Sequence, residues 1–244
     1  KMASKKKGVI VLKKNNTLKV TYSHRNSEMR LVGKRVIKWI KSAGVDAISD
    51  YYDKVTLIKE ETPMTEEQKE SYKKYIPEQL WPETEHMTWQ EALAWTKDAV
   101  APLKDFYPYM VDYSGFVGAW ANRWRYIIDL DNNLFIVVRA GLEMLLFDSC
   151  DTYPPEYDWM RKVAHTEIGR FPLDNIPEDW IEQCDKYWKS LMIIAVDYSH
   201  NKEAMDSEHV QEMGVNGYNP ADSDWEKIKF FYGQNSYNKM ISDM

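Results

Sequence analysis

Residues 125–141 read RYIIDLDNNLFIVVRAG, and this stretch decides the fold class. Apolar and β-branched residues stand on both sides of a polar centre that consists of Asp131, Asn132 and Asn133. Asp and Asn favour turns because their side chains bond to the nearby backbone and because they tolerate a left-handed conformation. The stretch therefore predicts a β-hairpin.

A second stretch has the same arrangement near the start of the chain. Residues 11–22 read VLKKNNTLKVTY, in which Asn15 and Asn16 separate two strand-like segments. We expect the strands of this hairpin at 9–14 and 17–23. Helical patterns lie between and after the hairpins. The sequence therefore predicts an α+β fold, in which an antiparallel sheet built from Asn-Asn hairpins packs with several helices.

The segment after the first hairpin predicts a cationic amphipathic helix. Residues 33–44 read GKRVIKWIKSAG, where Val36, Ile37 and Ile40 form an apolar stripe and Lys and Arg stand elsewhere. This spacing predicts a helix of about three turns that ends at its final glycine. The loop before Gly33 would direct backbone N–H groups toward the helix N-terminus, which is a natural anion site.

Two capping-box patterns predict further helices. Thr65 is followed three residues later by Gln68, and Thr88 is followed by Glu91 at the same spacing. Each pair predicts a helix start, because each side chain can bond to the backbone N–H group of the other residue. We expect these helices to stop before the prolines at 77 and 102, with a proline-broken loop at 77–87.

The region after the second hairpin predicts three more elements. Residues 176–190 predict a helix, 191–199 a buried strand and 222–233 a last helix. One face of the first of these helices carries Trp180, Ile181, Cys184 and Trp188 at helical spacing.

Length and charge suggest how the chain is organised. With 244 residues, of which 44% are hydrophobic, the chain can bury a sizeable core. We expect a single domain over 1–244, with a basic head (1–44), an acidic helical insert (62–101), and sheet and helices over 102–244. Residues 1–41 contain thirteen Lys or Arg and one acidic residue, although the whole chain has a formal net charge of −6. Such segregation indicates binding partners, or attraction between the two regions on folding.

Two stretches resemble a loosely defined, largely uncharacterised protein family found in bacteriophage genomes and some fungal genomes. In the first, TYSHRNSEMRLVGKRVIKWI, the family has a loop of the type Tyr-x-His/Gln-x-x-Ser before a Gly and a helix. The matching residues here are Tyr22, His24, Ser27 and Gly33. The second is the Tyr-x-Ile-Asp-Leu-Asp hairpin in YIIDLDNNLFIVVRAG. The chain departs from the pattern at SKKKG, where the family often has a Gly-Thr-Arg-Gly-like segment.

This resemblance implies a phage origin. Small accessory phage proteins often act against host defences, so the resemblance implies a non-catalytic protein that counteracts host defence by binding a host macromolecule. The partner would be a host protein or a protein–nucleic acid complex, met by an acidic, aromatic-rich surface.

Cysteine count and hydropathy bear on the compartment. Two cysteines are too few for a disulfide framework and indicate a reducing compartment. No signal peptide pattern follows the basic N-terminus, and the longest apolar run, LMIIAV, is too short to span a bilayer. We expect a protein of the host cytoplasm that has no membrane contact and no cofactor.

The basic head favours a second function, a nucleotide- or RNA-binding module. Lys and Arg contact phosphates, and Tyr22 or Trp39 could stack on a base. The expected binding residues are Tyr22, His24, Arg25, Lys34, Arg35, Lys38 and Trp39.

Asp129 and Asp131 suggest a third function, a metal-dependent hydrolase. In a strand these carboxylates point to the same face about 6.6 Å apart, and such a pair can hold Mg²⁺ or Mn²⁺. The alternative is that Asp131 serves the turn while Asp129 forms a charge pair within or across strands. We favour the alternative and predict no metal site.

The remaining polar pairs are less specific. His165 stands near Glu167, and Asp197 stands near His200 and His209, but their spacing does not select a metal site. No nucleophile motif, P-loop or Gly-x-Gly-x-x-Gly occurs. An enzyme is therefore the less favoured interpretation.

Overall fold

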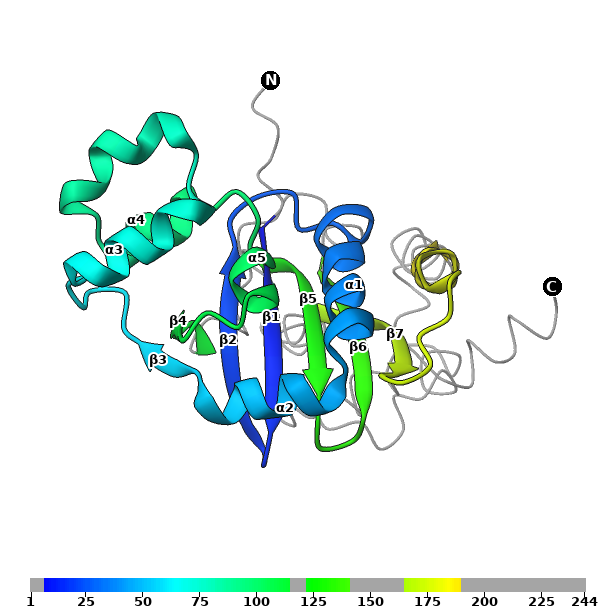
Figure 1. Cartoon of the computed structure of the whole chain (residues 1–244). Coiled ribbons are helices and arrows are strands. Elements are labelled where there is room, and N and C mark those ends of the chain that lie inside the picture. The colour runs from blue at the N-terminus through cyan, green and yellow to red at the C-terminus, as the bar shows by residue number, and fades with distance from the viewer. Residues whose placement is uncertain (1–6, 115–121, 141–164, 190–244) are drawn as a thin grey trace, which may run out of the picture. The chain divides into compact units, whose positions relative to one another are not determined.

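The computed structural model describes residues 7–114, 122–140 and 165–189 (Figure 1). The chain divides into two compact units. The first comprises Lys1–Ile136 and Phe171–Pro177, and the second comprises Val137–Arg170 and Glu178–Met244. The elements predicted at 191–199 and 222–233 lie outside the described residues.

The described residues form a five-stranded sheet with the strand order β2-β1-β5-β6-β7, and the α+β class is confirmed. Both predicted hairpins are present, and the first has strands at the expected positions. The strands are β1 Lys7–Lys14, β2 Thr17–Ser23, β5 Asn122–Asp129, β6 Leu134–Ala140 and β7 His165–Pro172.

The sheet is mixed, whereas the sequence predicted an antiparallel one. β1 and β2 are antiparallel, but β1 pairs with β5 in parallel, with Lys13 opposite Asp129. Parallel neighbours need a long crossover connection, and the helices between the two hairpins provide it. Because β1 and β5 run in the same direction, both hairpin turns lie at the same end of the sheet.

The two turns are bonded to each other. Asn15 and Asn16 have φ angles of 53° and 56°, as a two-residue type I′ turn requires. The carboxylate of Asp131 accepts the backbone N–H groups of Asn15 and Asn16 at 2.6 and 3.1 Å. The backbone N–H of Leu130 donates to the carbonyl of Lys13 at 2.9 Å. The second turn therefore caps the first.

Two helices follow the first hairpin and pack on one face of the sheet (Figure 1). A π-helical turn, η1 Met29–Gly33, leads directly into α1 Lys34–Ala43, and α2 Val45–Lys54 follows. The helix predicted at 33–44 is confirmed, with its apolar stripe buried. Gly44 has a φ of 81° between the two helices, a conformation that glycine adopts without strain.

The acidic insert, 62–101, and the segments that flank it form a mainly helical lobe beside the edge strand β2 (Figure 1). Both capping boxes are present, with Thr65 and Thr88 as N-caps. The segment predicted as a loop at 77–87 is instead mostly 3-10 helix. The elements are β3 Thr56–Ile58, α3 Glu66–Tyr72, η2 Lys73–Tyr75, η3 Glu78–His86, α4 Trp89–Trp95, α5 Ala101–Lys104 and β4 Tyr109–Val111.

α4 ends at Trp95, whereas the sequence predicted a helix that continues almost to the proline at 102. The hydroxyl of Thr96 donates to the carbonyl of Ala92 at 2.7 Å, and the Thr96 backbone, with a φ of −56° and a ψ of 122°, is no longer helical. The next N–H, of Lys97, donates to the carbonyl of Tyr75 at 3.1 Å. These tertiary and side-chain bonds replace the helical ones, so residues 96–99 form a loop.

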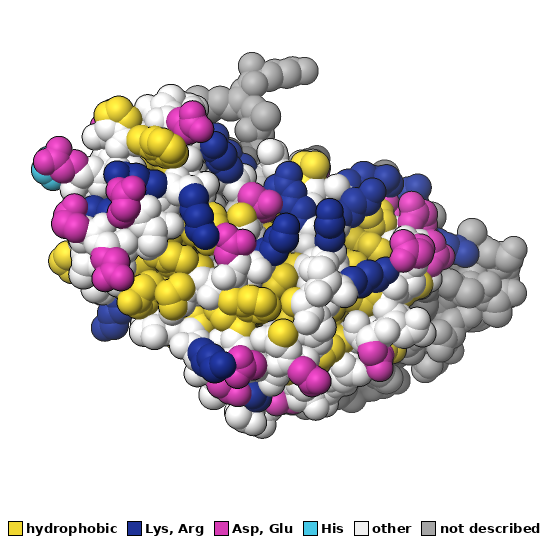
Figure 2. All heavy atoms as spheres, in the orientation of Figure 1, with side chains coloured by type: hydrophobic (Ala, Val, Ile, Leu, Met, Phe, Trp, Pro, Cys, Tyr) yellow, Lys and Arg dark blue, Asp and Glu magenta, His cyan; other side chains and the backbone are white. Residues whose placement is uncertain are grey.

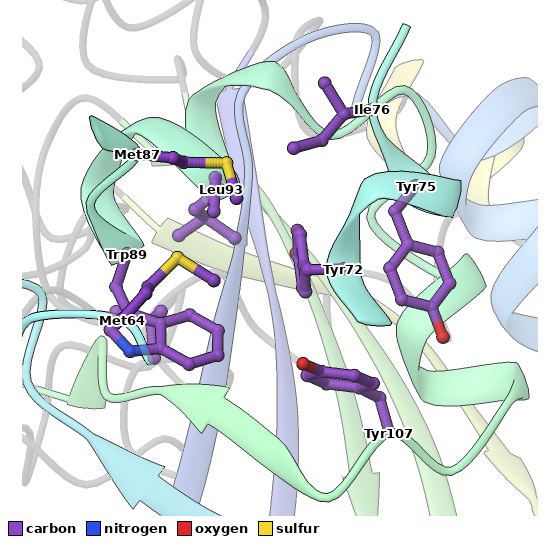
Figure 3. Packing of buried hydrophobic residues seen from close by; sticks show 10 residues of the cluster. Met64, Tyr72, Tyr75, Ile76, Met87, Trp89, Leu93 and Tyr107 are labelled. Atoms are coloured by element: carbon purple, nitrogen blue, oxygen red, sulfur yellow. The ribbon is translucent and has the colours of Figure 1, made fainter. Parts of the chain in front are cut away.

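An aromatic cluster holds this lobe together (Figure 3). Tyr72 lies at its centre, edge-on to Trp89 and Tyr107 with ring centroids 5.8 and 5.3 Å away. Met87 and Leu93 pack against these rings (Figure 3). Edge-to-face pairs of this kind add to the stabilisation that comes from burying apolar surface.

The described part of the second unit contains the helix that the sequence predicted at 176–190, and the structure has it at residues 180–189. Its predicted apolar face is buried, including Cys184. Arg139 lies over the ring of Trp188 at 4.2 Å, and Arg170 pairs with Glu167 through two bonds of 2.8 and 2.9 Å. No helix of the described residues is long and apolar enough to cross a membrane.

Asp131→Ala should lower the free energy of unfolding by about 1–2 kcal/mol, because two backbone N–H groups lose a charged acceptor. Urea denaturation of both proteins measures this loss. Glu61→Ala, which removes an exposed carboxylate elsewhere, is the control. Equal stabilities for the two variants would contradict the role of Asp131 in joining the turns.

Candidate functional site

Four of the seven expected binding residues line one pocket of about 430 Å³ in the first unit: Tyr22, His24, Arg25 and Arg35. The other three lie elsewhere.

Lys34 and Lys38 are exposed on α1. Trp39 is only 1% exposed and lies edge-on to Tyr51 in the core. Its burial corrects the expectation that it could stack on a base, because the apolar stripe of α1 is wide enough to include it.

Two walls form the pocket. The first wall comprises the end of β2 and the loop after it, together with Leu31, Val32 and Arg35 from η1 and α1. The second wall comes from the acidic lobe and includes Leu80 and the segment 93–99. Residues some 60 positions apart in the chain therefore face the same space.

The loop of the first wall is fixed to the sheet. Ser27 is fully buried, and its hydroxyl donates to the carbonyl of Ser23 at 3.1 Å. The hydroxyl of Tyr126 donates to the carbonyl of Ser27 at 2.6 Å. A Cβ added at Gly8 would lie 2.7 Å from the Cβ of Ser27, so β1 has glycine where the loop approaches it. Asn26 takes a positive φ of 54° in the same loop.

The sequence predicted a backbone anion site before α1, but the π-helical turn there bonds the backbone N–H groups that would form it. The backbone N–H of Gly33 donates to the carbonyl of Glu28 at 3.2 Å, and that of Lys34 donates to the carbonyl of Met29. The N–H groups at the start of α1 are therefore already bonded. Any anion in the pocket would be bound by side chains.

Cationic side chains reach the pocket from both walls. Arg25 and Arg35 belong to the first wall, and Lys97 belongs to the second. Among the described residues that line the pocket, Asp98 brings the one carboxylate, and it lies 3.3 Å from the guanidinium of Arg35. Asp98 also accepts the backbone N–H of Val100 at 3.0 Å. The side chains of the pocket therefore have a positive balance.

Aromatic residues also stand on both walls. The ring of Tyr22 stacks on that of Tyr113, with centroids 5.3 Å apart and an interplanar angle of 12°. The ring of His24 contacts the ring of Tyr22 edge-on. The hydroxyl of Tyr113 donates to Glu60 at 2.7 Å. Burial and this carboxylate raise the pKa of Tyr113, which therefore stays neutral. Trp95, half-buried, lines the second wall.

Sequence reasoning missed the second wall. It placed Trp95, Lys97 and Asp98 inside a helix that was expected to continue to the proline at 102. The run Thr96-Lys97-Asp98 was the available signal, because Thr and Asp bond to nearby backbone groups and disfavour helix interiors.

Part of the basic head serves the fold. Lys13 pairs with Asp129 at 2.8 Å, and Lys14 pairs with Asp53 at 2.5 Å. The ammonium of Lys19 donates to two carbonyls at the end of α2, at 2.7 and 2.8 Å. The exposed cations that remain belong to the loop after β2, to η1 and to α1. Residues 1–6 lie outside the described residues.

The carboxylate of Asp129 accepts hydrogen bonds from the turn that follows it. It is 4% exposed, and one of its oxygens accepts the backbone N–H groups of Asp131 and Asn132, both at 3.1 Å. The other oxygen accepts from Lys13 and from the Asn132 amide at 2.8 and 2.9 Å. Burial alone would raise the pKa of Asp129, but these bonds hold it below its ordinary value.

The remaining candidates do not form a second site in the described part of the chain. Among residues 7–114, 122–140 and 165–189, no three His, Cys, Asp or Glu side chains lie close enough to share a metal ion. Burial raises the pKa of the Cys184 thiol. Asp197, His200 and His209 lie outside the described residues. The metal-dependent hydrolase stays an alternative hypothesis.

No family model matches the chain, and no curated protein or solved structure matches it either. The resemblance to the phage and fungal family therefore stays a prediction.

Asp129→Asn should destabilise the protein by about 2 kcal/mol at pH 7, because a bonded carboxylate loses its charge. A carboxyl with a lowered pKa stabilises the fold above its ordinary pKa, and this contribution disappears as the pH falls through the lowered value. Urea denaturation should therefore show a large difference in the free energy of unfolding between wild type and Asp129→Asn at pH 7. This difference should be smaller at pH 3.

Asp46→Asn, at an exposed position, is the control. If Asp129→Asn keeps full stability but abolishes Mn²⁺ uptake and hydrolysis, the hydrolase hypothesis is favoured instead.

Proposed function

We propose that this protein binds a nucleotide in the pocket between the loop after β2 and the loop after α4. The observation that carries the proposal is that cationic and aromatic side chains from both walls face one pocket of about 430 Å³. This volume lies within the range of small-molecule sites, which are mostly apolar with a few placed polar groups.

The cations suit a phosphate. Arg25 and Arg35 come from one wall and Lys97 from the other. Guanidinium groups bind phosphate oxygens through paired, charge-assisted hydrogen bonds, and an ammonium adds a compact charge. A phosphate bound by both walls would satisfy the positive balance of the pocket.

The apolar and aromatic residues suit a base. Leu31, which is unusually exposed for its size, lines the pocket beside Leu80 and Trp95. Stacking of a base on aromatic and apolar side chains is tolerant of sequence, because every base has a π-face. Tyr22 already stacks on Tyr113, so Trp95 replaces the buried Trp39 as the aromatic partner that we propose for a base.

Asp98 acts as an internal competitor in this proposal. Its carboxylate holds Arg35 at 3.3 Å, and both side chains are partly exposed. A pair of this kind contributes little stability, so a phosphate with two or more negative charges can displace it. An anion with a single charge displaces the Asp98 carboxylate less readily, so the pocket should prefer phosphate esters to such anions.

Arg35→Ala should weaken binding of adenosine and uridine triphosphates by about ten- to a hundredfold, the effect of removing a hydrogen bond to a charged group. Isothermal titration calorimetry measures the change. Lys59→Ala removes an exposed positive charge outside the pocket and is the matched control.

Asp98→Asn should act in the opposite direction and tighten binding by about two- to fivefold, since it removes the competing charge. The amide oxygen can still accept the N–H of Val100, so the loop keeps its cap. Inorganic phosphate that binds as tightly as a nucleotide, or equal affinities for all the variants, would contradict the proposal.

A second candidate follows from the surface of the acidic lobe. Trp81 on η3 is 43% exposed, and the exposed carboxylates of Glu78, Glu83 and Glu85 belong to the same short helix. Exposed Trp residues are frequent binding hot spots, and acidic groups complement basic surfaces. This surface supports the proposal that the protein counteracts host defence by binding a host macromolecule.

Under this second candidate, Trp81→Ala should abolish a complex that the wild-type protein forms in host lysate after nuclease treatment, whereas Arg35→Ala should retain it. Affinity capture with and without nuclease tests this. Capture that nuclease abolishes, or that survives Trp81→Ala, would contradict it.

A further inference from the structure

We infer that the nucleotide in the pocket is one unit of a single-stranded nucleic acid, and that the neighbouring phosphates of the strand lie along the exposed cationic face of α1. This inference rests on the proposed nucleotide pocket. It extends the ligand from a mononucleotide to a strand.

The outer face of α1 is cationic along its whole length. Its exposed positions carry Lys34, Arg35, Lys38 and Lys41, and the helix contains no Asp or Glu. The buried side chains of α1 lie on the opposite side. In the face of the molecule drawn in Figure 2, Lys and Arg side chains gather over α1.

The cationic face is continuous with the pocket. Arg35 lines the pocket, Lys38 follows three residues later, and Lys41 follows after three more. Residues at this spacing are neighbours on a helix surface, and each step advances about 4.5 Å along the axis. A strand that leaves the pocket at Arg35 therefore meets further cations at short, regular intervals.

The fold itself does not account for the charges of Lys34 and Lys38. Lys34 and Lys38 stand four residues apart, where like charges repel and destabilise a helix. Within the part of the chain that the structure describes, neither forms an ion pair. By contrast, Lys13, Lys14 and Lys19 of the same basic head are bonded to the rest of the fold. An external polyanion would relieve the repulsion along α1.

The pocket favours a single strand over a duplex. The bases of a duplex are paired and stacked, and a base cannot enter a pocket without leaving the stack. In a single strand each base is free to turn into the pocket while its phosphates follow a cationic groove or face. RNA and DNA share this chemistry, so both belong in the test.

The test measures fluorescence anisotropy with ten-residue oligo(U) and oligo(dT) over a range of salt concentrations. Single-strand affinity falls with salt at a logarithmic slope of about −0.7 for each phosphate contacted. Lys34→Ala/Lys38→Ala should therefore lessen the slope by about 1.4. The matched control, Lys59→Ala/Lys104→Ala, removes the same charge from exposed positions outside α1 and should leave the slope unchanged.

The outcomes separate this inference from the proposed pocket. It is supported if the oligonucleotides bind more tightly than uridine monophosphate and only the α1 double variant changes the salt slope. It is overturned if a duplex of the same length binds equally well, or if the two double variants behave alike. If uridine monophosphate still binds in that case, and Arg35→Ala weakens its binding, the pocket proposal is supported without the strand. Failure of all these ligands to bind would overturn both.

Discussion

The parallel pairing of β1 with β5 is the constraint on which the rest of the first unit depends. It brings both hairpin turns to one end of the sheet, where the carboxylate of Asp131 bonds the first turn to the second. Asp129, two residues earlier at the end of β5, is held by Lys13 and by its own turn. The paired carboxylates that resemble a metal site thus account for the register between two distant hairpins. At the opposite end of β1, the same sheet positions the loop of the pocket through Gly8 and Ser27.

The charge of the basic head has two separate uses. Near the turns, lysines are bonded to carboxylates and to the end of a helix, and they hold the hairpins and α2 in place. Along α1 and at the pocket, Lys34, Arg35 and Lys38 are exposed, and Arg35 pairs with Asp98 at 3.3 Å. Mutual attraction between the basic and acidic regions therefore explains the first set, and it does not explain the exposed charges of Lys34 and Lys38.

Local signals predicted the elements well, and non-local contacts account for the differences. The Asn-Asn turns, the stripe of α1 and both capping boxes depend on residues within a few positions of one another. The parallel pairing of β1 with β5 and the end of α4 at Trp95 depend on partners far along the chain, such as the carbonyl of Tyr75 that binds Lys97. For the same reason the sequence predicted only the first wall of the pocket. That wall is a contiguous segment, whereas the second wall comes from a separate lobe.

The bond between the two turns also sets the order in which this chain can fold. Asn15 and Asp131 are separated by 116 positions, so their contact belongs to the slow, long-range class that limits folding rates. During synthesis the first hairpin emerges long before β5 exists, and an isolated two-stranded hairpin is marginally stable. Until β5 arrives, the apolar edge of β1 is open to pairing with other chains. The helices α3 and α4 of the intervening segment carry their own capping boxes, so their starts are stabilised by local contacts before β5 is synthesised.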